Sequence, residues 1–313
     1  MGRIGWGAGR DMQPTSQGAL LSAAMLMIAA MAIIGVIDNY IVVLAEFIGL
    51  WQFHVTRTIV ALPLIAGLSL LGLGGLRPLR YWAVLLRSFL LATAMMCYFT
   101  ALAFMPIAQA LAGLFSSPIF VLLITAFALR QPVGFWRIGA VLIGFAGILL
   151  VLQPDPNAFD YRMLIPLCGG FFYALSAIST RSLCAGESTV VLLGAAIGAL
   201  GLIGGVALLG LSLFPLEAAP GPEGFVARGW VWPMTPAIPF VLLQAMGSVI
   251  AVYMLTKAYQ LAEPSYVSVF EYSVMIFGPL FAWVAFGQSL NALQILGIAL
   301  IACAGITIAL RSG

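Results

Sequence analysis

Two stretches decide how this chain is organised: GAVLIGFAGILLVL at Gly139–Leu152 and GIALIACAGITIAL at Gly297–Leu310. When the sequence is shifted by 158 residues (297 minus 139), seven of their 14 positions are identical. The same shift places Pro106 on Pro264. Glycine and proline each fix a backbone feature that apolar filler does not, so these matches carry more weight than shared leucines. The chain is therefore predicted to consist of two homologous halves.

The composition indicates a membrane protein. Hydrophobic residues make up 63% of the chain and charged residues 7%, whereas about 25% of the residues in a soluble domain are charged. A bilayer leaves no partner for a backbone amide, so each lipid-facing segment has to pair its own amides as a helix. We expect an all-α integral membrane protein whose surroundings are a lipid bilayer. The net charge of +3 does not indicate nucleic acid as a partner.

A helix spans a bilayer with about 20 apolar residues, and hydropathy together with turn residues predicts ten such helices. After an N-terminal tail at 1–17, they are predicted at 18–38, 53–73, 82–104, 107–129, 134–152, 163–181, 189–213, 237–260, 265–286 and 290–310. The first five form one repeat at 18–152 and the last five form a second at 163–310. Six prolines fall between Leu213 and Pro239, which predicts an extended loop there, either a lid or a passive connector.

Five helices per half is an odd number, so the second half enters the membrane from the opposite side. The predicted fold is therefore ten transmembrane helices arranged as two inverted five-helix repeats. Inverted repeats are the usual construction of secondary transporters, in which two similar halves open a central site to either face in turn.

The arginines predict the orientation. With the N-terminus inside, one set of helix ends collects most of the basic residues, and the positive-inside rule places that set in the cytoplasm. These residues are Arg3, Arg10, Arg77, Arg80, Arg130, Arg137, Arg181, Lys257 and Arg311. Both termini are then cytoplasmic, and the loop at 213–239 lies outside.

Several runs of sequence resemble the EamA-like branch of the drug/metabolite transporter superfamily. They are YFTALAFMPIAQA at Tyr98–Ala110, FSSPIF at Phe115–Phe120, GAVLIGFAGILLVLQP at Gly139–Pro154 and LTKAYQLAEPSYVSVFEYS at Leu255–Ser273. The resemblance implies two inverted five-helix halves around a central cavity, and alternating access in the bacterial inner membrane. It implies a small organic metabolite as cargo, amino-acid-like or otherwise amphipathic.

The chain also departs from that family's pattern. Where relatives often end the fourth helix of each half with Gly-Glu, this sequence has Leu129–Arg130 and Gly287–Gln288. Relatives often carry a basic residue three positions after the acidic residue of the first helix, and here Ile41 follows Asp38. An ion-pair gate can therefore not be transferred from the family to this chain.

Ionisable side chains inside the membrane are the first candidates for a substrate site, because each costs about 2.5–3.5 kcal/mol at the centre of a helix. Arg57 and Arg87 either hold an anionic group of the substrate or reach a neighbouring helix or the interface. Asp38, predicted near the outer end of the first helix, is a partner for Arg57, a proton carrier or a surface carboxylate. Polar and aromatic groups at membrane depth complete the predicted substrate-binding set: Tyr98, Gln109, Ser116, Tyr173, Ser176, Gln244, Tyr253, Glu271 and Tyr272.

Lys257 and Glu271 are predicted to meet. The two residues lie on either side of the turn near Ala262 and differ in depth by about three residues, or roughly 4.5 Å. We expect a partly buried ion pair near the cytoplasmic mouth, with either a structural or a gating role.

The alternatives to a transporter are a channel, a lipid scramblase and an intramembrane enzyme. The sequence lacks HExxH, GxSxG and CxxC motifs and has one histidine, His54, so no catalytic or metal site is predicted and no cofactor is expected. The absence of a repeated polar filter sequence speaks mildly against a channel. A scramblase stays open at this point.

The predicted orientation is tested by labelling from the outside. In a cysteine-free background, an impermeant thiol reagent added to intact cells should modify a cysteine placed at Glu223 and spare one placed at Leu79, because the arginine asymmetry puts the first outside and the second inside. The reverse labelling pattern would show that the assigned orientation is wrong.

Overall fold

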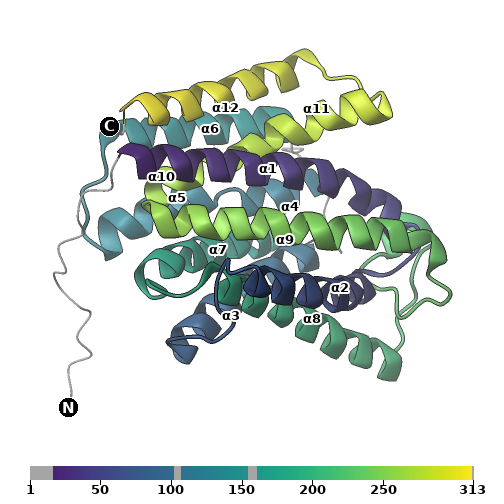
Figure 1. The fold of residues 1–313 in the computed structure, drawn as a ribbon. Helices are drawn as coiled ribbons and strands as arrows, with labels where there is room; N and C mark the ends of the chain where they lie inside the picture. The colour runs from purple at the N-terminus through teal and green to yellow at the C-terminus, as the bar shows by residue number, and fades with distance from the viewer. Residues whose placement is uncertain (1–16, 102–106, 154–160, 312–313) are drawn as a thin grey trace.

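The computed structural model describes residues 17–101, 107–153 and 161–311, apart from the side chains of residues 107–109 and 163. The described part consists of helices and their connections (Figure 1). The longer helices are α1 (Gln17–Ala45), α2 (Leu50–Leu70), α3 (Tyr81–Ala101), α6 (Phe135–Leu152), α7 (Leu164–Ser182), α8 (Thr189–Leu213), α9 (Ile238–Leu261), α11 (Val274–Phe286) and α12 (Ala292–Arg311). Shorter pieces are α4 (Ile107–Leu114), α5 (Ser117–Leu123), the π-helix η1 (Ile124–Ala128), η3 (Tyr161–Met163), η4 (Gly221–Gly224), η5 (Thr235–Ala237), α10 (Pro264–Val267) and the 3₁₀-helix η6 (Ser268–Ser273).

Ten helical segments in the described ranges are long and apolar enough to cross a membrane. Seven are single α-helices, and the eighth adds the short turn η5 to the start of α9. The fourth is built from α4, α5 and η1, and the ninth from α10, η6 and α11. The expected all-α fold with ten transmembrane helices is confirmed, although two of the predicted continuous helices are interrupted.

The interruption in the fourth span lies at Ser116, between α4 and α5. The Gly113 carbonyl accepts from both the hydroxyl and the backbone N–H of Ser116, at 2.6 and 3.2 Å, so Ser116 closes the last turn of α4. A Cβ at Gly170 of α7 would lie 2.6 Å from Ser116 Oγ, so the break packs directly against the backbone of α7. Pro118 follows in the first turn of α5, where its missing N–H costs nothing.

The packing of the helices shows how the two repeats are related. The four most extensive helix pairs are α6–α12, α1–α9, α2–α8 and α3–α7 (Figure 1). In span order they pair fifth with tenth, first with eighth, second with seventh and third with sixth. Exchanging the halves, so that each span moves five places, returns the same four pairs. The two five-helix repeats are therefore related by a pseudo-two-fold axis, and they are inverted because five is odd.

Two sets of side-chain-to-backbone hydrogen bonds repeat this relation at opposite ends of the molecule. Just before α8, the Glu187 carboxylate accepts hydrogen bonds from the backbone N–H groups of Leu79 and Arg80, at 2.9 and 2.6 Å. At the start of α2, the Gln52 amide donates to the Val231 carbonyl at 2.9 Å and accepts from its N–H at 2.8 Å. The second helix is α2 in the first repeat and α8 in the second. A side chain at the start of each one thus bonds to the loop that follows the other.

The loop at 213–239 is packed rather than free. Phe225 is buried with Trp51 and Leu44 in an apolar cluster at the ends of α1 and α2. Arg228 donates to carbonyls of the α1–α2 connection, including that of Ala45 at 2.5 Å. The extended loop predicted from its prolines is present, with two short 3₁₀ turns, η4 and η5, and it covers this end of the bundle.

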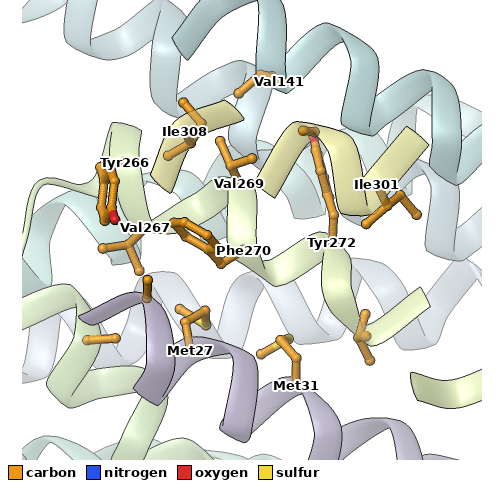
Figure 2. Close-up of a cluster of buried hydrophobic side chains, with 14 of the residues drawn as sticks. Met27, Met31, Val141, Tyr266, Val267, Val269, Phe270, Tyr272, Ile301 and Ile308 are labelled. Atoms are coloured by element: carbon orange, nitrogen blue, oxygen red, sulfur yellow. The ribbon is translucent and has the colours of Figure 1, made fainter. Parts of the chain in front are cut away.

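The largest buried apolar cluster lies around η6 (Figure 2). In this view the segment Tyr266–Tyr272 runs between Met27 and Met31 of α1 on one side and Ile301 and Ile308 of α12 on the other. Such a core gives the interrupted ninth span a fixed position despite its non-α geometry.

One predicted helix end is wrong. The sequence prediction ended the first helix at Asp38, whereas α1 continues to Ala45. Asn39 is accommodated within the helix because its amide donates to the carbonyls of Gly35 at 2.7 Å and Gly278 at 3.1 Å. Asp38 therefore lies seven residues, or roughly 10 Å, inside the helix end, and not at the surface end of the span.

The helices α6 and α12 touch through the two sequence stretches that revealed the repeat. A Cβ at Gly147 would lie 2.7 Å from the Gly297 backbone oxygen, and one at Gly297 would lie 2.6 Å from the Gly147 oxygen. Their counterparts under the repeat are Gly305 and Gly139, and a Cβ at Gly139 would meet nothing within 4 Å. The helices are thus in backbone contact at one crossing only.

We expect Gly147→Ala to lower the melting temperature of the purified protein and Gly139→Ala to leave it unchanged or raise it. The first adds a methyl group against a fixed backbone oxygen, and overpacking of this kind costs about 1–3 kcal/mol. The second gains helix propensity, about 1 kcal/mol for glycine to alanine, without a clash. Thermal unfolding in detergent measures both, and equal effects would show that the crossing is looser than described.

Candidate functional site

Arg57 stands at the centre of a polar cluster between the first three spans. Its Nη2 lies 3.2 Å from Nδ1 of His54, one turn earlier on α2, and its guanidinium carbon lies 5.0 Å from the centre of the Phe53 ring. The Nε of Arg57 and the Nε2 of His54 are buried and have no hydrogen-bond partner. Two nitrogen atoms at membrane depth are therefore left without a partner in the protein.

Asp38 of α1 and Tyr98 of α3 complete this cluster, which we call the Arg57 cluster (Asp38, His54, Arg57 and Tyr98). Asp38 interacts electrostatically with both Arg57 and Tyr98, yet its side chain stays exposed. Between described residues the direct ion pair is Arg137–Glu263, so Asp38 balances the charge of Arg57 without occupying its nitrogens.

Aromatic rings border the Arg57 cluster. The rings of His54 and Phe99 are 4.8 Å apart in an edge-to-face arrangement, and those of Tyr98 and Phe99 are 5.2 Å apart. Ring faces with nearby donors suit a ligand that has both an apolar plane and polar atoms. Chemically, the cluster can bind an anionic or hydrogen-bond-accepting group beside a flat apolar one.

Glu271 of η6 lies in a second, buried cluster. Its Oε1 accepts hydrogen bonds from the hydroxyl of Tyr173 on α7 at 2.9 Å and from that of Tyr259 on α9 at 2.7 Å. Only 2% of Glu271 is exposed. The carboxylate joins three spans, and two tyrosine hydroxyls take the place of a cation beside it.

Arg87 is held by neighbouring helices. Its guanidinium donates to the Thr180 hydroxyl at 3.1 Å, the Leu192 carbonyl at 3.1 Å and the Thr256 hydroxyl at 3.4 Å. Ser176, another predicted site residue, donates to the Arg87 carbonyl at 3.2 Å. All three guanidinium nitrogens are engaged, so of the two roles open for Arg87 the geometry matches the pairing with neighbouring helices.

The other predicted site residues are dispersed. Gln244 donates from its amide to the Ile37 carbonyl at 2.5 Å and so joins α9 to α1. Tyr253 reaches the Leu73 carbonyl at 3.4 Å. Ser116 serves the break in the fourth span, and the side chain of Gln109 lies outside the described residues.

Tyr272 differs from these because its hydroxyl is buried and without a partner. Its ring packs against Gly144 of α6, where an added Cβ would lie 2.4 Å from the ring. A buried hydroxyl without a hydrogen bond costs about 1–3 kcal/mol. Together with Nε of Arg57 and Nε2 of His54, it is one of three buried groups without a partner among the described candidate substrate-binding residues.

The expected ion pair between Lys257 and Glu271 does not form, since the partners of Glu271 are the two tyrosines. The prediction rests on depth along the helices and leaves out direction around them. Tyr259 faces Glu271, and Lys257 lies two residues earlier, about 200° around the same helix. The ion pair at this end is Arg137–Glu263 instead, which joins α6 to the α9–α10 connection.

His54 and Tyr259 are the functional candidates that the sequence reasoning missed. The spacing of His54 and Arg57, three residues apart on a helix, is a signal that predicts contact. Tyr259 has no such signal, because its partner Glu271 lies beyond a helix break. Across the described chain no three His, Cys, Asp or Glu side chains are grouped as a metal site requires.

Comparisons with known proteins agree on a family. The model of the EamA-like transporter family matches residues 21–153 and 162–310, one match on each repeat. A riboflavin transporter of Rhizobium johnstonii is 27% identical over 310 residues, which cover 96% of this chain and 96% of that protein. A riboflavin transporter of Vibrio cholerae is 27% identical over 205 residues, 65% of this chain and 63% of that one.

A solved crystal structure has the same fold. It superposes with a TM-score of 0.77 at 18% sequence identity, covering 92% of this chain and 98% of the other. At this identity the likeness concerns the fold alone.

We expect removal of the hydroxyl oxygen to change the free energy of unfolding differently at two buried tyrosines. Tyr259→Phe removes a hydrogen bond to the Glu271 carboxylate and should lower the free energy of unfolding by about 1–3 kcal/mol. Tyr272→Phe removes a hydroxyl that has no partner, so it should be neutral or stabilising. Tyr253→Phe, which loses only a long contact of 3.4 Å, is the matched control. Unfolding in detergent measures all three, and a loss at Tyr272→Phe as large as at Tyr259→Phe would contradict the assignment.

Proposed function

The chain belongs to the EamA-like transporter family, and we propose that it carries a small amphipathic metabolite across the bacterial inner membrane by alternating access. Membership makes it a multi-pass membrane transporter of small molecules and not an enzyme. The proposal adds the kind of solute, the residues that bind it and the mechanism.

The orphaned nitrogens of Arg57 and His54 carry the proposal. A buried polar group without a partner costs about 1–3 kcal/mol, and more when it is charged, and within a bilayer no solvent relieves that cost. A transported solute that accepts hydrogen bonds from these atoms removes the cost while it is bound. Asp38 beside them is exposed and occupies neither nitrogen, whereas all three nitrogens of Arg87 and Oε1 of Glu271 already have partners.

The class of solute follows from the surroundings of Arg57. Phe53, His54, Tyr98 and Phe99 offer ring faces and edges next to a cation, which favours a flat heteroaromatic compound with polar substituents. Riboflavin combines a planar ring system with a polar chain, and two relatives are named as its transporters. Riboflavin is therefore the first compound to test.

Alternating access is supported by the bonds that join the helix ends on one side of the bundle. At the end where α1 begins and α12 ends (Figure 1), Arg137 pairs with Glu263 and the Arg181 guanidinium donates to the Gln260 carbonyl. The Gln260 side chain in turn accepts from Thr189 at 2.6 Å and donates to the Glu187 carbonyl at 2.8 Å. These bonds close that end, and a solute leaves there only after they break. The inverted repeat supplies a second arrangement in which the opposite end is closed.

A transport assay separates this proposal from the alternatives. Proteoliposomes that contain the protein should take up labelled riboflavin with saturation, which a channel would not show, and should not move lipids between leaflets as a scramblase would. Arg57→Lys keeps the charge but loses the planar fork, and the loss of one charge-assisted bond of about 1.5–3 kcal/mol raises KM by about tenfold or more.

The control is Arg130→Lys, at an exposed arginine outside the Arg57 cluster, which should transport like the wild type. Melting temperatures confirm that both variants are folded. If a folded Arg57→Lys variant has the KM of the wild type, the assignment of Arg57 is wrong. If the wild type does not take up riboflavin but another flat heteroaromatic solute stabilises it and is transported, the compound is wrong and the site stands.

A further inference from the structure

A cavity unrelated to the Arg57 cluster lies between α2, α3 and α8. Its volume is about 370 Å³, within the range of about 300–1,000 Å³ that is usual for ligand sites. It is located where the loop at 71–80 joins α2 to α3. Its walls include Leu62 and Ile65 of α2, Leu76 and Pro78 of the loop, Leu85 of α3 and Gly194 of α8.

The cavity is apolar and opens outward. Its lining is aliphatic apart from Tyr81. Leu62, Leu85 and Tyr81 are 45%, 65% and 65% exposed, and they belong to membrane-spanning helices, so the opening faces the surrounding lipid. A cavity of this kind fits hydrocarbon. Tyr81 carries the one polar side-chain group among its described lining residues.

Positive charge gathers at one end of this cavity. Arg77 sits between the lining residues Leu76 and Pro78, is exposed, and makes no hydrogen bond or ion pair to the residues that the structure describes. Arg80 lies next to Tyr81 and uses one guanidinium nitrogen on the Ala185 carbonyl at 2.7 Å.

The start of α3 already holds an anion. The helix begins at Tyr81, and the backbone N–H groups of Leu79 and Arg80 just before it donate to the Glu187 carboxylate at 2.9 and 2.6 Å. That carboxylate takes the positive end of the helix dipole. Within the described part of the chain, Arg77 is therefore the cation beside the apolar cavity that stays open to an anion from outside the protein.

We propose that this cavity binds one anionic phospholipid of the surrounding bilayer. An acyl chain fills the space between α2, α3 and α8, and the headgroup phosphate contacts Arg77. Tyr81 lies at the level of the headgroup, where tyrosine is favoured. A neutral lipid would leave Arg77 without a counter-ion, and a soluble anion would leave the apolar walls uncovered. Basic pockets between transmembrane helices bind anionic lipids in this way.

The proposal is tested with the purified full-length protein in detergent, to which phosphatidylglycerol or phosphatidylcholine with identical acyl chains is added. Phosphatidylglycerol should raise the melting temperature more than phosphatidylcholine, and native mass spectrometry should retain one tightly held phosphatidylglycerol. Arg77→Gln should weaken its binding by about fivefold, the equivalent of about 1 kcal/mol for one basic residue. Gly194→Leu, which fills the cavity, should abolish the retained lipid.

Two controls match these variants. Arg130→Gln removes another exposed arginine outside the cavity, and Gly198→Leu places the same side chain one turn further along α8, where an added Cβ meets nothing within 4 Å. Both should keep the effect of phosphatidylglycerol. Soluble glycerol phosphate should not compete, because it lacks the acyl chain.

Three results would overturn the proposal: equal stabilisation by the two lipids, unchanged retention in Arg77→Gln, or full competition by glycerol phosphate. Arg77 lies on an exposed loop, so its variant is informative even if Gly194→Leu fails to fold. The measurement does not depend on which solute is transported.

Discussion

A bilayer offers no hydrogen-bond partner to the groups inside it, and this constraint sorts the polar residues of the ten spans into two kinds. All three guanidinium nitrogens of Arg87 are bonded to neighbouring helices, and Oε1 of Glu271 accepts from two tyrosine hydroxyls. These groups hold spans together. Nε2 of His54, Nε of Arg57 and the hydroxyls of Ser88, Ser268 and Tyr272 are buried without partners. Because such groups cost free energy, they are the candidates for a role other than stability.

The repeat relates the two ends of the fold to each other. Exchange of the halves preserves the four main helix pairs. It also relates the hydrogen bonds of Glu187 to the loop after α2 with those of Gln52 to the loop after α8. It does not preserve the close contacts, since α6 and α12 meet at Gly147 and Gly297 and not at the counterparts of those glycines. A symmetric chain that packs asymmetrically has two equivalent ways to do so. Alternating access, as proposed for this chain, requires two such arrangements.

Much of the fold could be predicted from sequence because hydropathy and the spacing of glycine and proline act locally. The predicted spans at 189–213 and 134–152 agree with α8 and α6 to within one residue. The predicted end at Asp38 was wrong because Asn39 bonds to the carbonyl of Gly278 on a distant span, which no local pattern reveals. Within the site, Asp38, Arg57 and Tyr98 were identified from the cost of polar groups at membrane depth. The Lys257–Glu271 pair failed because depth along a helix was considered without direction around it, and because η6 is wound as a 3₁₀-helix.

The helix packing is the same in the two repeats, but the polar residues of the candidate site are not. Under the repeat, Glu271 corresponds to Gly113 and Tyr259 to Ala101, and Tyr98 corresponds to Thr256, which serves Arg87. A frame that is symmetric gives two alternative closed ends of similar free energy. Side chains that are not symmetric make the two states bind a solute differently, and only such a difference lets a solute shift the balance between them. In the proposed alternating access, the duplicated backbone would therefore supply the motion, and the divergence of a few polar positions would couple that motion to binding.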